Sequence, residues 1–98
     1  MARYTLMNAS DIVRDGLGVE LVDMNQQTVA EAFRCDRDQT VVVNTFGNDI
    51  PLDAMSALLR YAQSYLEPFE NGKPLDQASN FGFLEVANAA HKLSESGN

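Results

Sequence analysis

The sequence predicts an α+β domain, in which a three- or four-stranded antiparallel meander carries a long amphipathic helix on one face and a second helix follows at the C-terminus. Strand-like segments follow one another through short connections between residues 18 and 46, which favours antiparallel pairing. An apolar stripe of helical period begins at residue 52. The 98 residues fit one domain over 1–98, with its core at 18–66.

Three strands are expected, over residues 18–24, 27–35 and 39–46. The last is the clearest because it is dense in β-branched residues. A short strand or ordered arm over 3–7 would be the fourth, and Asp11–Asp15 is expected to form one helical turn. Two glycines follow that turn and are free to adopt positive φ.

Glu31 interrupts the alternation of the second of these strands. It falls on the same face as Val29 and Phe33, where an apolar residue is expected. The sequence therefore predicts either a bulge in this strand or a sheet face that is partly open. An open face and exposed sheet edges would favour association with another chain.

The long helix is predicted from residue 52 to about residue 66. Its apolar stripe consists of Leu52, Met55, Leu58, Leu59, Ala62 and Leu66. Pro51 suits a first helical turn, and Pro68 disfavours helix in the residue before it. The preceding stretch FGNDIPLD could suggest a metal or phosphate loop, but it matches neither pattern and is explained as a strand-to-helix turn.

A second amphipathic helix is predicted over about 80–94, after a connector rich in proline and glycine. Asn80 is its candidate cap, and residues 95–98 are expected to fray. Its apolar stripe consists of Phe83, Val86, Ala87, Ala90 and Leu93. The pattern leaves open whether this helix packs on its own sheet or on that of a neighbouring molecule.

The net charge of −7 excludes some classes of partner. It opposes non-specific binding to nucleic acid or to an anionic membrane, and it suits a basic protein partner. The single cysteine, Cys35, permits no intrachain disulfide and is typical of a reducing compartment. No apolar run approaches the ~20 residues of a membrane span, and no signal-peptide core is seen, so we expect a cytoplasmic protein.

Residues for catalysis are sparse in this chain. His91 is the only histidine, and Cys35 and Ser56 are the formal candidates for a nucleophile, but neither has a recognisable catalytic setting. A zinc site needs several histidine or cysteine ligands. The sequence therefore predicts no catalytic, cofactor-binding or metal-binding residues.

Acidic residues are the candidates for partner binding, namely Glu20, Glu31, Asp36 and Asp38. The alternative is that they form a solvated rim with Arg34 and Arg37 as counter-charges. The first functional hypothesis is a non-catalytic protein-binding domain of inhibitor, immunity or antitoxin type. The alternatives are a homodimeric structural or accessory domain, and a small enzyme or ligand-binding domain that uses Cys35 or His91.

Overall fold

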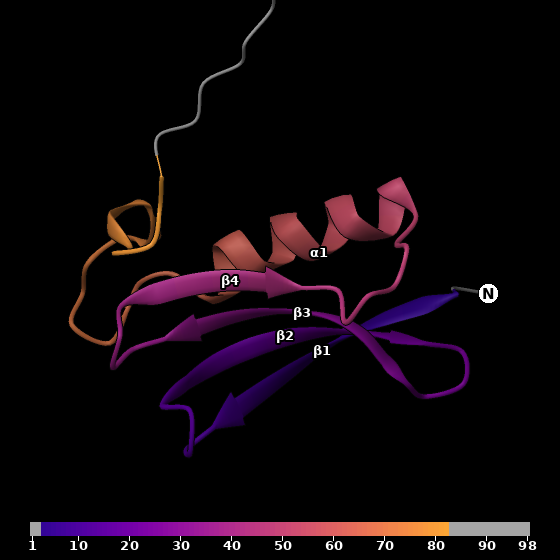
Figure 1. The fold of residues 1–98 in the computed structure, drawn as a ribbon, viewed down its shortest axis with the longest axis horizontal. Helices are drawn as coiled ribbons and strands as arrows, with labels where there is room; N and C mark the ends of the chain where they lie inside the picture. The colour runs from indigo at the N-terminus through magenta and orange to yellow at the C-terminus, as the bar shows by residue number, and fades with distance from the viewer. Residues whose placement is uncertain (1–2, 83–98) are drawn as a thin grey trace, which may run out of the picture.

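The computed structural model describes residues 3–82 and contains four strands, one α-helix and one 3₁₀ turn (Figure 1). The elements are β1 (Tyr4–Asp11), β2 (Gly16–Asp23), β3 (Thr28–Cys35), β4 (Thr40–Asn44), α1 (Leu52–Tyr65) and η1 (Leu75–Gln77). The strands form one antiparallel sheet in the order β1-β2-β3-β4, and α1 packs on one face. This confirms the predicted α+β meander with an N-terminal fourth strand. The predicted helix over 80–94 falls, beyond Gly82, outside the described residues.

The first hairpin differs from the expectation. β1 continues to Asp11, so the predicted helical turn at Asp11–Asp15 is wrong. Instead, residues 12–15 form a tight connection, closed by the Asp15 amide donating to the Ile12 carbonyl at 3.2 Å. The glycines that follow belong to β2, and Asp15 is the residue with positive φ. Gly16 is needed for close approach, because a Cβ there would lie 1.9 Å from the Arg34 carbonyl oxygen.

The pairing of β2 with β3 contains the irregularity that Glu31 indicated. Leu21 pairs with Ala30, but Val22 pairs with Thr28, which leaves Val29 without a partner in β2. This is a bulge of one residue. As a result, alternate β3 residues from Ala30 onward face α1, and Glu31 and Phe33 lie on the opposite face of the sheet.

The core lies between α1 and the middle of the sheet. Its buried members are Val19, Leu21, Ala30, Ala32, Ala54, Leu58, Ala62, Leu66, Phe69, Leu75 and Ala78. Of the predicted stripe, the helix buries Leu58 and Ala62, and it also buries Ala54, which the predicted stripe did not include. Leu52, which was expected in that stripe, is 87% exposed because it stands at the first helical position, beyond the contact with the sheet.

The connector after α1 packs back on the sheet. Ser79 donates its amide to the Gln39 carbonyl at 2.7 Å. The Asn80 side chain accepts from the Val41 amide at 3.0 Å and donates to the Val41 carbonyl at 2.9 Å. Asn80 therefore does not cap a helix within the described residues. Its side-chain amide instead forms both hydrogen bonds to the backbone of Val41 at the outer edge of β4.

Candidate functional site

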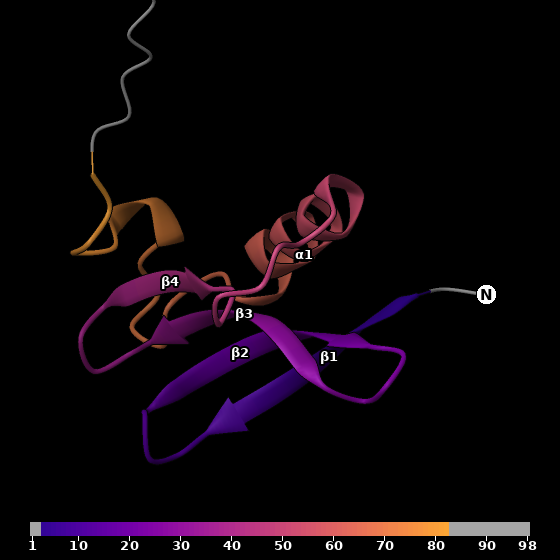
Figure 2. The ribbon, with the colours of Figure 1, turned by 45° about the vertical axis from the view of Figure 1, so that its right-hand side comes forward.

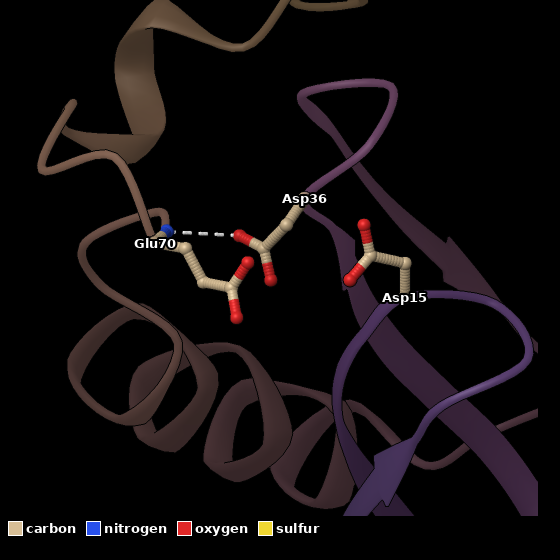
Figure 3. A group of neighbouring side chains, drawn as sticks. All are labelled: Asp15, Asp36 and Glu70. Atoms are coloured by element: carbon tan, nitrogen blue, oxygen red, sulfur yellow. Dashed lines mark hydrogen bonds between the residues drawn. The ribbon is translucent and has the colours of Figure 1, made fainter.

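Three carboxylates converge at one end of the sheet, and we call Asp15, Asp36 and Glu70 the acidic cluster (Figure 3). One oxygen from each lies within 4.8 Å of one from each of the others. Asp15 precedes β2 and Asp36 follows β3, and the pairing of Gly16 with Cys35 brings these two ends together. The Asp36 amide donates to the Asp15 carbonyl at 2.8 Å. Glu70 joins them from the connector, since its amide donates to Asp36 Oδ1 at 2.9 Å.

Arg34 holds Asp36 in place. Its Nη2 lies 2.8 Å from Asp36 Oδ2, and the two side chains are 7% and 4% exposed. Its Nη1 donates to the carbonyls of Leu66 at 2.7 Å and Pro68 at 2.6 Å. The positive charge of Arg34 at these carbonyls also interacts favourably with the negative, C-terminal end of the α1 dipole. Arg34 therefore forms a buried junction, because it links β3 to the end of α1 and to the connector through these contacts. The prediction that Arg34 lies in a solvated rim is wrong.

The acidic cluster borders a shallow hollow of about 290 Å³. The hollow is also lined by Arg34 and by residues of the β1–β2 hairpin, including Asp11 and Leu17. Asp36 has both oxygens engaged by donors from Arg34 and Glu70. Within residues 3–82, no hydrogen-bond donor reaches the carboxylates of Asp15 and Glu70. Four negative charges and one positive charge among the lining residues leave this hollow with a net charge of −3.

The geometry suits a ligand with several donors better than a bare metal ion. Ca²⁺ takes six to eight oxygen ligands, as a general rule. Here two carboxylates are free, and each oxygen of the third already accepts a hydrogen bond. The Arg34 guanidinium adds positive charge beside the hollow, which disfavours a bare cation further. An ammonium group with three N–H donors can instead bind two carboxylates and a water.

Glu31, one of the predicted partner-binding residues, lies on the face of the sheet opposite α1. Arg14 donates two hydrogen bonds to it, Nη1 to Oε1 at 3.0 Å and Nη2 to Oε2 at 2.8 Å. The Glu31 side chain is 9% exposed. The same guanidinium carbon lies 3.9 Å from the centre of the Phe33 ring. Hydrogen bonding to Glu31 and then to Asp11 raises the pKa of Arg14. Glu31 is thus occupied by an internal ion pair.

The other predicted acidic residues are dispersed. Glu20 lies opposite Glu31 in the sheet and accepts a hydrogen bond from Thr28 Oγ1 at 3.2 Å. Asp38 lies in the exposed β3–β4 turn, 3.3 Å from Arg37, and exposed pairs of this kind contribute little stability. Of the four predicted residues, the structure therefore places only Asp36 in the acidic cluster.

Sequence reasoning missed Asp15 and Glu70. A signal for Asp15 was present, because any register that pairs the start of β2 with the end of β3 sets Asp15 beside Asp36. Glu70 had no such signal, since its place depends on how an irregular connector folds back. Cys35 is buried and its thiol donates to the Arg14 carbonyl at 3.3 Å, while His91 lies outside the described residues.

Neutralising one member of the acidic cluster should stabilise the free protein. We expect Glu70→Gln to raise the free energy of unfolding by about 0.5 kcal/mol, because it removes like-charge repulsion at short range. Urea denaturation at low salt would measure this gain, which should shrink at high salt. Asp49→Asn removes an equal charge from an exposed loop and should change stability less. A loss of stability in Glu70→Gln would contradict repulsion within the cluster.

Comparisons with protein-family models, with curated proteins and with solved structures gave no significant match for this chain. No helix among residues 3–82 is both long and apolar enough to cross a membrane.

Proposed function

We propose that this chain is a non-catalytic protein-binding domain whose acidic cluster receives a basic side chain of a partner, in the manner of an inhibitor, immunity protein or antitoxin. The observation that carries the proposal is the pair of unengaged carboxylates, Asp15 and Glu70, on either side of a buried and fixed Asp36. Two carboxylates that are held close together and have no donors of their own repel each other in the free protein. Such an arrangement is expected where a cation from outside completes it.

A lysine or arginine end group fits this arrangement. The hollow of about 290 Å³ can admit the end of one such side chain. Asp15 and Glu70 provide acceptors, and the net charge of −7 would steer a basic partner toward the domain. The single cysteine supports placing this function in the cytoplasm.

The homodimeric structural or accessory domain remains the second candidate. It is favoured by β1, an eight-residue strand that pairs only with β2 among the described residues and so presents an open edge. Met7 and Val42, on the face away from α1, are about half exposed. The third candidate, an enzyme or ligand-binding domain using Cys35 or His91, gains no support from the buried position of Cys35.

The test uses two double variants that both change the net charge from −7 to −5. Asp15→Asn with Glu70→Gln neutralises two of the three carboxylates of the acidic cluster, and Glu20→Gln with Asp49→Asn removes two charges elsewhere. Tagged wild-type protein is used to capture a partner from lysate of its own organism, and the affinity of that purified partner is then measured for each variant. We expect the cluster variant to lose at least tenfold in affinity and the control variant to lose less than threefold.

Salt provides a second readout, since an electrostatic complex should weaken as ionic strength rises. Equal loss in the two variants would show that only net charge matters, which contradicts the role of the cluster. Capture of further copies of the same chain, and of no basic protein, would favour the homodimeric domain instead.

A further inference from the structure

The two edges of the sheet differ in how well they are covered. At one edge, β4 has only five residues, and the Asn80 side chain occupies the backbone amide and carbonyl of Val41. At the other edge, β1 has eight residues, and among residues 3–82 its backbone is hydrogen-bonded only to β2. Figure 2 shows β1 along this margin of the sheet, with no other element of the described chain beyond it.

The strand β1 lacks the features that keep an edge from pairing. Natural edge strands are blunted by proline, by charged side chains, especially lysine, or by bulges. The segment Tyr4–Asp11 contains no proline and no lysine, and it pairs with β2 in unbroken register. Its one charged side chain, Asp11, stands at the end of the strand and is already paired with Arg14. A further strand can therefore form a ladder along the outer side of β1.

The sequence of β1 selects the register in which a second copy fits. Backbone groups point outward at every other residue of a strand, so outward-pointing residues must meet outward-pointing residues. In a two-fold antiparallel pair, the axis therefore passes through a residue rather than between two. An axis at Met7 places Arg3 opposite Asp11 of the second copy, on the same face of the joined sheet. Moving the axis by one residue in either direction separates these opposite charges.

We propose that β1 pairs antiparallel with β1 of a second copy, with the two-fold axis at Met7, so that the two sheets join into one. Opposite charges at its two ends make this segment self-complementary, which is what a two-fold contact requires. Residues 4–10 between these ends are uncharged, although each copy carries a net charge of −7. The pairing uses no carboxylate of the acidic cluster, so it goes beyond the proposed function and holds or fails independently of it.

The register can be tested by disulfide formation in full-length protein that carries Cys35→Ser, which keeps a donor toward the Arg14 carbonyl. Met7→Cys places two thiols at the axis, where directly opposite Cα atoms lie about 4.5–5.5 Å apart, within the range of a disulfide. Thr5→Cys places its two thiols on the same face but about 14 Å apart, four residues along the ladder. We expect Met7→Cys to form a linked dimer at least tenfold faster than Thr5→Cys under the same oxidant. Thr5→Cys mixed with Ala9→Cys should cross-link as Met7→Cys does, because these residues lie opposite each other.

A charge at the axis provides a reversible test. Met7→Lys sets two ammonium groups directly opposite each other, and Met24→Lys makes the same substitution in the exposed β2–β3 turn. Analytical ultracentrifugation would measure the dissociation constant of each dimer. We expect Met7→Lys to raise this constant at least tenfold and Met24→Lys to change it less than threefold. Salt should strengthen the wild-type dimer, because it screens the repulsion between two copies of net charge −7.

Three results would overturn the proposal. These are a wild-type chain that stays monomeric at every concentration tested, equal cross-linking rates for Met7→Cys and Thr5→Cys, and equal weakening of the dimer by the two lysine variants. None of them bears on binding through the acidic cluster, which is measured with variants of Asp15 and Glu70. A complex with a basic partner also responds to salt in the opposite direction, since it weakens as ionic strength rises.

Discussion

Replacing Arg34 with methionine is expected to lower the free energy of unfolding by about 3–5 kcal/mol, the usual cost of removing one partner of a buried ion pair. The substitution leaves the carbonyls of Leu66 and Pro68 without their donor and Asp36 without its counter-charge. Because a domain is stable by only about 5–15 kcal/mol, this variant should be close to unfolding at 25 °C. Urea denaturation followed by circular dichroism would measure the change.

A matched control is available in Arg37. Its guanidinium pairs with Asp38 at 3.3 Å, but the two side chains are more than half exposed. Arg37→Met should therefore cost less than about 1 kcal/mol. Arg34→Lys should fall between the two, because one ammonium cannot reproduce the planar geometry that reaches three acceptors. If Arg34→Met were as mild as Arg37→Met, the junction would not hold the fold together.

A double-mutant cycle separates the ion pair from the rest of the junction. Asp36→Asn should be costly in the wild-type background, where it removes the counter-charge of Arg34. In the Arg34→Met background the same change should cost less or even stabilise, because it neutralises a carboxylate that has lost its partner. Equal costs in the two backgrounds would mean that the pair is not coupled.

Local pattern was sufficient to predict the regular elements of this fold. Both patterns can be recognised within a short stretch of sequence. The β-branched run indicated the strand β4, and the helical spacing of Leu58, Ala62 and Leu66 indicated a helix. Boundaries were less accurate where glycine was involved. Gly16 was expected in a turn, but the sheet uses it for the close approach of β3.

The environments of charged residues could not be predicted in this way. Arg34 and Glu31 are both compatible with a solvated strand, and their burial follows from partners distant in sequence, Leu66 for one and Arg14 for the other. The same limit applies to the acidic cluster. Hairpin register can set Asp15 beside Asp36, but Glu70 arrives through a connector that has no periodic pattern.

Phe69 links the stability of the connector to the placement of Glu70. It is 1% exposed and belongs to the main core, although it lies in an irregular segment. Its amide donates to the Lys73 carbonyl at 3.0 Å and its carbonyl accepts from the Gly72 amide at 2.8 Å, which closes the loop that contains Glu70. The ring therefore anchors the loop that delivers the third carboxylate of the acidic cluster.

We expect Phe69→Ala to lower the free energy of unfolding by about 3–5 kcal/mol, since it removes a buried ring and leaves a cavity that the core fills only in part. Phe69→Leu should recover most of the loss because it restores much of the apolar volume. Phe46→Ala serves as the control, since that ring is half exposed and its loss should cost under about 1 kcal/mol. Thermal and urea denaturation would rank the three variants.

The same substitution also tests the proposed function. Where Phe69→Ala remains folded at low temperature, the loop that holds Glu70 has lost its anchor, so affinity for a basic partner should fall as it does for Glu70→Gln. Phe69→Leu should bind nearly as the wild type does. If Phe69→Ala kept full affinity while losing several kcal/mol of stability, Glu70 would not need its fixed position, and the partner would recognise the charge of the domain rather than the geometry of the cluster.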